Sequence, residues 1–548
     1  MEGNAFIRQN TLGAGSNNAR TENGAISYAT MGKALLDQFG KAGAYRGRPI
    51  EVVWDDQAKL WSEDVESAMK IPFYLRMITR KAKTNDGEQT EQVQKGQGAK
   101  DESIKRLLWI AKYHPESFYK NLWLVPVVGS WRDLWVMLFL ESENEDKYLD
   151  HIKFYSVMAE GMTSEYSKDL AKKYMPRIRS NSKCTTSWAK TTNNLAKEFC
   201  HTVGWSYKDY REFKATGMAH DFQKIICSGR YGDIDWNKIP GKALLNLISS
   251  KFLDKHRLTE SYIEWLEKQP MAKFNGYVYE LGHKAMGYGP KTSRATVMTV
   301  NKQFRQLIKT AEDGIEGGAI KGNVLCALDT SASMTWENFS GVTPLDICLS
   351  LGVYFSELNK GAFHDTVAMF SNDSKLLKLS GEFVDKLSQI THERPAMGGT
   401  NFQSLIDLIV RTRLNNPEIP LEDFPTTLLV VTDNQFNPSN GYRYNPATGV
   451  REELTNYEAA KHKLSMSFPK EFVDNFKIIW WNVTSRYTSD FPSTMEHGGT
   501  YMFSGFDGAI ISLLLGGEYE ETENNESPSM EDIIRKAFDQ EVMKLVQV

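Results

Sequence analysis

Three runs in the second half of the chain are apolar along almost their whole length: NVLCALD at 323–329, TLLVVTD at 427–433 and FKIIWWNV at 476–483. Such runs predict strands buried on both faces, because a strand with one face in water alternates polar and apolar side chains. Helical patterns lie between them, PLDICLSLGVYFSELN at 344–359 and NFQSLIDLIVRTRL at 401–414. Buried strands that alternate with helices predict a doubly wound, mainly parallel α/β sheet.

Further elements extend this pattern on both sides. TVAMFS at 366–371 reads as another strand, and GTYMFSGFDGAIISLLLG at 499–516 reads as a strand followed by a helix. We therefore predict an α/β domain over residues 322–518. An acidic linker and a C-terminal helix, MEDIIRKAFDQEVMKLV at 530–546, make up a final segment over 519–548.

The first half has a different periodicity. Apolar residues recur at spacings of three and four, as in Met31, Leu35, Leu36 and Phe39, and no strand alternation intervenes. This favours an all-helical domain over residues 26–310, built as a HEAT-like ring or solenoid of stacked helices. Residues 1–25, rich in Gly, Asn and Ser, are expected to be a flexible N-terminal segment, and the polar stretch 81–100 an exposed loop.

Charge is distributed unevenly along the chain. Residues 1–320 carry 47 Lys and Arg against 38 Asp and Glu, and residues 151–310 carry 27 against 14. A basic region of this kind suits a polyanionic partner. The five cysteines have no CxxC spacing, and no apolar run approaches the roughly 18 residues of a membrane span. We therefore expect a cytoplasmic protein with no membrane partner.

The densest basic stretch lies at 171–197, and the segment YKDYREFK at 207–214 adds alternating basic and aromatic residues. Several Lys and Arg contacts to phosphate would make binding strongly dependent on salt. We expect the aromatic residues in this region to pack between helices rather than to stack on bases, because Tyr and Trp commonly fill helical interfaces. The candidate RNA-binding residues are Lys172, Lys173, Arg177, Arg179, Lys183, Lys190, Lys208, Arg211 and Lys214.

The sharpest chemical motif is Asp329-Thr-Ser331-Ala-Ser333, which directly follows a predicted strand. A carboxylate and two hydroxyls on one turn direct oxygen atoms to one point, which suits a hard cation such as Mg²⁺. Thr400, in MGGTNF, and Asp433, at the next strand end, complete in chain order the five positions of a metal-ion-dependent adhesion site. This combination resembles the von Willebrand factor A domain.

The resemblance implies a role for each residue. Asp329, Ser331 and Ser333 would form the metal-binding loop, with the serines contacting the ion directly. Thr400 would contribute its hydroxyl, directly or through water, and Asp433 would lie in the outer shell. One coordination position would stay open for the acidic oxygen of a protein partner, so the site would bind rather than catalyse.

A wider resemblance covers most of residues 20–515. The segments NGAISYATMGKALLDQFGKAG, FYLRMITR, VPVVGSWRDLW, AMGGTNFQSLIDLIV, LLVVTDNQFN, IIWWNV and MFSGFDG occur in the order seen in TROVE-type proteins, which include the Ro autoantigen. The match is nearer to a less characterised sister family of plants and viruses. It implies a helical ring that binds small structured RNA and admits single-stranded RNA ends.

Catalytic motifs are not evident. There is no GxxxxGK[ST] phosphate loop and no GxSxG elbow, and two-metal nuclease chemistry needs more carboxylates than Asp329 and Asp433. We therefore expect a non-catalytic RNA-binding scaffold with a Mg²⁺-binding domain for partner contacts. The alternative is a protein–protein adhesion or assembly module that does not bind RNA, and the two differ in whether residues 171–214 form one basic surface.

Overall fold

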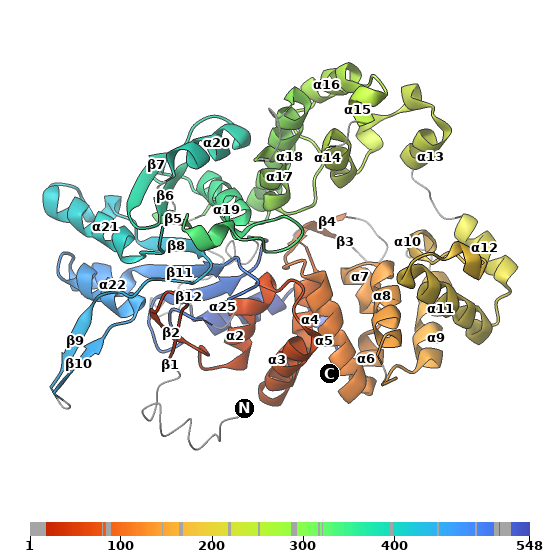
Figure 1. Ribbon diagram of the computed structural model, residues 1–548, viewed down its shortest axis with the longest axis horizontal. Helices are drawn as coiled ribbons and strands as arrows, with labels where there is room; N and C mark the ends of the chain where they lie inside the picture. The colour runs from red at the N-terminus through yellow and green to blue at the C-terminus, as the bar shows by residue number, and fades with distance from the viewer. Residues whose placement is uncertain are drawn as a thin grey trace. The chain divides into compact units, whose positions relative to one another are not determined.

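The computed structural model (Figure 1) describes residues 18–548 except for 79, 84–88, 145, 164–167, 217–220, 250–251, 287–292, 316–317, 321, 395–397, 447–448, 488–489, 509–514 and 516–527. The chain forms two compact units. The sheet unit comprises the described residues of Met1–Tyr45, Tyr277–Pro290 and Ile315–Ile534. The helical unit comprises those of Arg46–Gly276, Lys291–Gly314 and Arg535–Val548.

The sheet unit is built on six strands in the order β12-β11-β8-β5-β6-β7. All neighbours pair in parallel except β6 and β7, which are antiparallel. Every residue of β5, β6 and β8 is buried, as expected for strands covered on both faces. The strands are β5 (Val324–Asp329), β6 (Thr366–Phe370), β7 (Ser374–Lys378), β8 (Thr427–Thr432), β11 (Lys477–Asn482) and β12 (Thr500–Ser504).

Helix α19 (Pro344–Leu358) covers one face of the sheet, and its sequence determines where it begins and how closely it packs. Thr343 and Asp346 form a capping box, and Pro344 occupies the first turn, where its missing N–H costs nothing. The helix packs on β5 and β8, and Gly352 permits the approach, because a Cβ there would lie 2.5 Å from Cδ2 of Leu328. The α-helices between β7 and β11 are α20 (Phe383–Glu393), α21 (Gln403–Asn415), α22 (Asn456–Ser465) and α23 (Lys470–Asn475).

The N-terminal segment belongs to the sheet unit. Strands β1 (Asn18–Arg20) and β2 (Ile26–Tyr28) form a hairpin, and helix α2 (Ala34–Lys41) packs against β12. The main chain of Tyr28 exchanges hydrogen bonds of 2.8 and 3.0 Å with Phe491. These residues therefore complete the sheet unit, whereas the sequence analysis divided them between a flexible segment and the helical domain.

Helix α17 (Val278–Ala285) also belongs to the sheet unit, although it falls within the predicted helical domain. Its Gly282 lies against Ser350 of α19, so closely that a Cβ would meet the serine hydroxyl. The small residues on both helices permit this contact, and helical periodicity alone does not reveal it.

The helical unit consists of short helices that pack mainly on near neighbours in sequence. Within the described residues, its regular strands are the hairpin of β3 (Arg80–Lys83) and β4 (Gln89–Gln94). Its helices are α3 (Ile50–Glu63), α4 (Val65–Arg76), α5 (Lys100–Tyr113), α6 (Pro115–Asn121), α7 (Leu124–Val128), α8 (Trp131–Ser142), α9 (His151–Thr163), α10 (Lys168–Tyr174), α11 (Ser187–Val203), α12 (Tyr207–Ala215), α13 (Asp221–Ser228), α14 (Gly241–Ser249), α15 (Phe252–Lys255), α16 (Thr259–Glu267), α18 (Arg294–Asp313) and α26 (Glu541–Lys544).

The predicted combination of a helical part followed by an α/β part is confirmed. The expectation of a loop at 81–100 is wrong, because the polar residues pair as β3 and β4 through main-chain hydrogen bonds, and Lys95 and Gln97 are buried. A second hairpin, β9 (Tyr442–Asn445) with β10 (Val450–Glu453), was also not foreseen.

The remaining expectations concern the ends of the chain. The C-terminal helix is interrupted into α25 (Met530–Phe538) and α26. Of the predicted flexible segment 1–25, residues 1–17 lie outside the described residues, as does most of the acidic linker.

Two further expectations concern the cysteines and membrane spans. None of the five cysteines forms a disulfide. Among the helices that the structure describes, none combines the length and apolar character needed to span a bilayer.

Substitution of Gly352 tests the close contact between α19 and β5. We expect Gly352→Ala to lower the free energy of unfolding by about 1–3 kcal/mol, because the added methyl group overpacks a buried contact with Leu328. Urea unfolding followed by tryptophan fluorescence measures the change. Gly498→Ala is the control, since a Cβ there meets no atom within 4 Å. Equal midpoints for the two variants would contradict the packing described.

Candidate metal and RNA-binding sites

The five predicted metal-site residues come together at the carboxyl end of the sheet. Asp329 ends β5 and Asp433 directly follows β8, and these two strands are neighbours. From β5 the chain proceeds to β6 and β7 on one side and returns to β8 on the other. The site therefore lies where strand order reverses, the usual position for ligands in open α/β sheets.

Asp329 is fully buried and held on both oxygens. Its Oδ1 accepts a hydrogen bond from the main-chain N–H of Ser331 at 2.9 Å. Its Oδ2 accepts one from the hydroxyl of Thr432 at 2.7 Å. Thr432 is a residue that the sequence analysis missed, although its place just before Asp433 on the strand that pairs with β5 could have suggested it.

The hydroxyl groups converge from two loops. The Oγ atoms of Ser331 and Ser333 lie 3.2 Å apart. The main-chain N–H of Ala332, between them, donates to the carbonyl of Gly398, which brings the loop carrying Thr400 alongside. The main-chain N–H of Thr400 donates to Oδ1 of Asn437 at 3.2 Å. The threonine is therefore fixed by its main chain, and its hydroxyl stays available.

Three buried oxygen atoms at this edge make no hydrogen bond within the described residues: Oγ1 of Thr400, Oδ2 of Asp433 and Oδ1 of Asn434. The other carboxylate oxygen of Asp433 accepts from the N–H of Gln435 at 3.0 Å. Asn434 adopts a left-handed backbone conformation, with φ of 62°, which turns the chain sharply after Asp433. Buried polar atoms normally have partners, so the free oxygens of Thr400 and Asp433 fit a site for a bound cation.

The pKa values of the two buried carboxyl groups also fit a cation site. Burial raises the pKa of Asp329 well above its ordinary value, and the neighbouring Asp433 carboxylate raises it further. Burial also raises the pKa of Asp433, partly offset by the nearby Ser333 hydroxyl and the Gln435 amide. Neither carboxylate makes an ion pair with any described residue. Two buried negative charges without a counter-ion are unfavourable, and a cation between them would relieve both.

The donor set fits a hard divalent cation such as Mg²⁺. Carboxylate and hydroxyl oxygens are its preferred ligands, and it commonly retains water at the remaining positions. Nowhere in the described part of the chain do three or more His, Cys, Asp or Glu side chains gather as a metal-binding group. A cation at this edge would therefore depend on hydroxyls and on two carboxylates.

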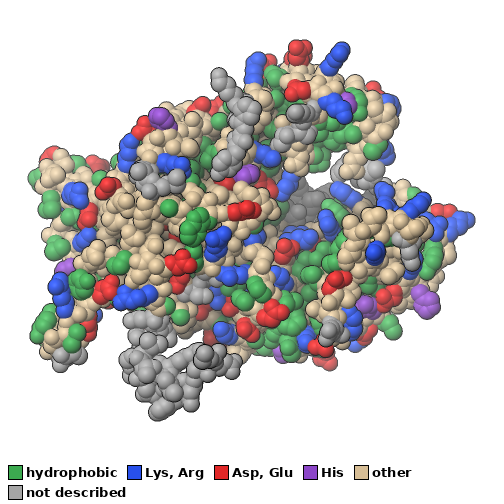
Figure 2. Space-filling model, in the orientation of Figure 1, with side chains coloured by type: hydrophobic (Ala, Val, Ile, Leu, Met, Phe, Trp, Pro, Cys, Tyr) green, Lys and Arg blue, Asp and Glu red, His purple; other side chains and the backbone are tan. Residues whose placement is uncertain are grey.

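The predicted RNA-binding residues lie on the helical unit, from α10 to α12, where Figure 2 shows Lys and Arg side chains at the surface. Between residues 171 and 214 there are ten Lys and Arg against three Asp and Glu. Most of the predicted cations are exposed, and Lys172 and Lys214 are half-buried.

Part of this basic set is brought together. The Lys214 ammonium donates to the main-chain oxygen of Lys172 at 3.2 Å, and the Lys172 ammonium lies 5.0 Å from the ring centre of Phe213. Burial lowers the pKa of Lys214, and the Arg177 guanidinium lowers it further. Lys172, Arg177 and Lys214 therefore form one basic group, although no described contact joins Lys190 or Arg211 to it.

The neighbouring aromatic residues pack rather than project. Trp188 lies 4.9 Å from Phe139, and Trp205 lies 5.1 Å from Phe213, measured between ring centres. Tyr210 is buried and its hydroxyl donates to the carbonyl of Pro176. Tyr207 differs, because it is 45% exposed. The expectation that these rings pack between helices therefore holds for Trp188, Tyr210 and Phe213 but not for Tyr207.

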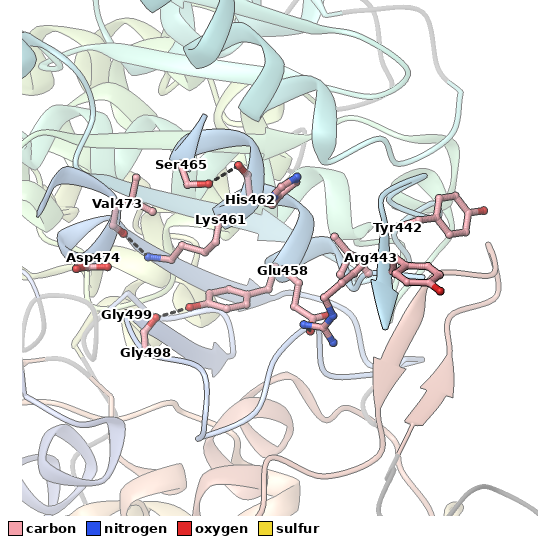
Figure 3. A pocket seen from close by; sticks show the side chains of 13 residues that line it. Tyr442, Arg443, Glu458, Lys461, His462, Ser465, Val473, Asp474, Gly498 and Gly499 are labelled. Carbon is pink, nitrogen blue, oxygen red and sulfur yellow. Dashed lines mark hydrogen bonds and ion pairs between the residues drawn. The ribbon is translucent and has the colours of Figure 1, made fainter. Parts of the chain in front are cut away.

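The sheet unit also contains a cavity of about 860 Å³ between β9 and α22 (Figure 3). Its polar side chains are engaged with the protein itself: Lys461 donates to the carbonyls of Val473 and Phe476 at 2.7 Å, and the Tyr457 hydroxyl donates to Gly498. Burial lowers the pKa of Lys461 to about 8. None of the metal-site residues lines this cavity, and we assign it no ligand.

The buried carboxylates make a pH prediction for the metal-free protein. The folded state raises the pKa of Asp329 from 3.8 to about 7. The folded state therefore holds this proton more tightly than the unfolded chain, and stability falls as pH rises through this interval. In excess chelator we expect the thermal midpoint of the wild type to fall as pH rises from 5 to 7. Asp329→Asn should fall less in scanning fluorimetry, and identical slopes would contradict the assignment.

Proteins similar to this chain include a family of domains, a viral protein and a solved structure. Residues 323–546 match a family model described as "Domain of unknown function (DUF7788)". Over 538 residues the chain is 22% identical to "Uncharacterized protein L728" of Acanthamoeba polyphaga mimivirus, covering 91% of this chain and 84% of the viral protein.

Among solved structures, the Ro (RSR) protein of Deinococcus radiodurans superposes with a TM-score of 0.33 and 14% identity, covering 89% of this chain and 99% of that one. This superposition is loose, so no feature of the Ro structure is carried over to this chain. The chain is thus similar over most of its length to a viral protein, and its C-terminal part matches the DUF7788 model.

Proposed function

We propose that the protein is a non-catalytic RNA-binding scaffold whose sheet unit is a von Willebrand factor A-type domain that holds Mg²⁺ for contact with a partner. The observation that carries the metal site is the pair of unpartnered buried oxygens, Oγ1 of Thr400 and Oδ2 of Asp433, beside the Asp329 loop. In this proposal the helical unit, with HEAT-like repeats, carries the RNA.

The metal would be held by oxygen atoms that are already in place. Asp329 and Asp433 supply negative charge, and Ser331, Ser333 and Thr400 supply hydroxyls. The hydrogen bond from Thr432 orients Asp329, as second-shell donors do in metal sites. Mg²⁺ bound in this way supplies a positive charge with a water-filled position that an acidic side chain can enter.

The basic residues of α10–α12 support the RNA part of the proposal. Arg177, Arg179 and Lys183 are exposed and form no ion pair with any described residue. Lys208 differs, because it lies 3.9 Å from Glu212. A surface of cations in excess over acids attracts phosphate, and the TROVE-like order of motifs along the chain makes RNA the favoured polyanion.

A binding role suits the chemistry better than a catalytic one. Phosphodiester hydrolysis by two metal ions needs several bridging carboxylates, and only two lie among the proposed metal ligands. Both are enclosed, and Asp329 is committed on both oxygens to hydrogen bonds. The proposal therefore assigns no reacting group to the site.

Removal of the central carboxylate tests the metal site. We expect Asp329→Ala to abolish the heat of Mg²⁺ binding in isothermal titration calorimetry. Thr400→Val, which removes only a hydroxyl, should weaken binding by about 10- to 100-fold. Asp423→Ala is the control, since Asp423 is an exposed acid that precedes β8 at the opposite end of the sheet. Mg²⁺ binding by Asp329→Ala equal to that of the control would refute the proposed ligand set.

Charge reversal tests the RNA surface. The triple variant Arg177→Glu, Arg179→Glu, Lys183→Glu should bind a labelled RNA hairpin with a single-stranded tail at least tenfold more weakly in fluorescence anisotropy. The slope of log affinity against log salt should fall by roughly two to three, since each lost phosphate contact removes about 0.7 to 0.9.

The matched control is Lys59→Glu, Lys255→Glu, Lys268→Glu, which changes net charge equally at exposed positions elsewhere on the helical unit. Equal loss in both triple variants would indicate a general charge effect and would contradict a defined RNA surface. Absence of RNA binding by the wild type at low salt would favour the protein–protein module instead.

A further inference from the structure

The hairpin of β9 and β10 extends away from the six-stranded sheet (Figure 1). Its register pairs Tyr442 with Glu453 and Tyr444 with Arg451. Directly paired residues, and residues two apart on one strand, have their side chains on the same side of a sheet. One face of the hairpin, which we call the tyrosine face, therefore carries Tyr442, Tyr444, Arg451 and Glu453.

The two aromatic residues of the tyrosine face are exposed. Tyr444 is 67% exposed and Tyr442 is 48% exposed, and Tyr444 is the most exposed aromatic residue that the structure describes. Single exposed apolar side chains are common on protein surfaces. Two rings about 6.5 Å apart along one strand differ, because together they form a continuous aromatic surface.

The tyrosine face also carries positive charge. The Arg451 guanidinium lies 4.2 Å from the centre of the Tyr442 ring, and Arg451 forms no ion pair with any described residue. Arg20 of β1 brings a second guanidinium to this face, where it lies 3.0 Å from Glu453. Two cations therefore meet one acid here, and this balance favours an anionic ligand.

The opposite face of the hairpin has the reverse balance of charge. Arg443 lies 3.4 Å from Glu452 on that face and 3.9 Å from Glu458 of α22. One cation there meets two acids and is engaged with both. The arginine without an acidic partner and the two exposed rings are thus all on the tyrosine face.

We propose that the tyrosine face binds single-stranded nucleic acid, with bases stacked on its aromatic surface and a phosphate contacted by Arg451. Aromatic rings beside cations hold single strands with little regard to sequence, because every base has a flat π-face. Arg451 covers part of the Tyr442 ring, and a guanidinium plane is itself a surface on which bases stack. This inference goes beyond the RNA surface proposed for α10–α12, and it does not involve the metal site.

The proposed ligand is a single strand rather than a duplex. The bases of a duplex stack on one another, so their flat faces are not accessible to protein rings except at the ends. A duplex would therefore offer the tyrosine face only its phosphates, and the two rings would contribute little to binding.

Fluorescence anisotropy of the full chain with a labelled oligo(U) RNA of about ten nucleotides tests the proposal, since sites of this kind cover roughly 4 to 16 nucleotides. Tyr442→Ala with Tyr444→Ala should weaken binding at least tenfold, because each lost stack weakens it by a factor of about five or more. The matched control, Tyr442→Phe with Tyr444→Phe, keeps both rings and should bind like the wild type.

Two further probes identify the strand. Oligo(dT) of the same length distinguishes DNA from RNA as the source of the strand, and loss of either one in the alanine pair supports the inference. The annealed duplex should bind the alanine pair as well as it binds the wild type. A duplex that loses as much affinity as the single strand would contradict stacking on the two rings.

The arginines give a test within the same hairpin. Arg451→Gln should weaken oligo(U) binding and lower the slope of log affinity against log salt by about 0.7, the value for one phosphate contact to a single strand. Arg443→Gln removes the same charge from the opposite face and should leave both quantities unchanged. Equal effects of the two variants would contradict a site on the tyrosine face.

The variants are also measured in the Arg177→Glu, Arg179→Glu, Lys183→Glu background, which removes the proposed RNA surface of the helical unit. Residual oligo(U) binding that the alanine pair abolishes would support the tyrosine face even if the helical unit binds no RNA. Absence of residual binding would overturn this inference and leave the helical-unit surface standing. An alanine pair that binds oligo(U) as the wild type does, or a phenylalanine pair that binds as weakly as the alanine pair, would also overturn it.

Discussion

The negative charge buried with Asp329 and Asp433 is the constraint around which this end of the sheet is organised. Parallel pairing of β5 with β8 places the two carboxylates at neighbouring strand ends, out of reach of bulk water. Hydrogen bonds from Thr432, Ser331 and Gln435 satisfy three of the four carboxylate oxygens. The fourth oxygen and the Thr400 hydroxyl have no partner among the described residues, and these two atoms support the proposed cation site.

The same loops tie the N-terminal hairpin to the sheet unit. Glu22 and Gln435 join β1–β2 to the turn after Asp433, and Tyr28 pairs with Phe491 farther along the same side. Helix α2 then packs on β12, where the hydroxyl of Ser504 donates to the carbonyl of Phe39. Residues 18–45 therefore pack on the strands and loops that follow residue 315, and they form part of the sheet unit.

Much of the sheet unit could be predicted from the sequence because its signals are local. The buried strands lie within a residue or two of the predicted apolar runs, such as 427–433. Four of the five candidate metal-site residues lie at the end of β5 or shortly after β5 or β8, and Thr400 is the exception. The packing of α2 could not be predicted, because the spacing of Leu35 and Phe39 reveals a helix but not the surface on which the helix packs. Thr432 was missed for the same reason, because it acts on Asp329, which lies far away in sequence.

The most direct test of the account is a crystal of the full chain grown with Mn²⁺, with data collected to give an anomalous difference map. The account predicts one strong peak at the carboxyl ends of β5 and β8, within coordination distance of oxygens from the loop at 329–333 and close to Thr400 and Asp433. A protein fully exposed to Mn²⁺ with no peak at this edge, or with a peak only elsewhere, would contradict it.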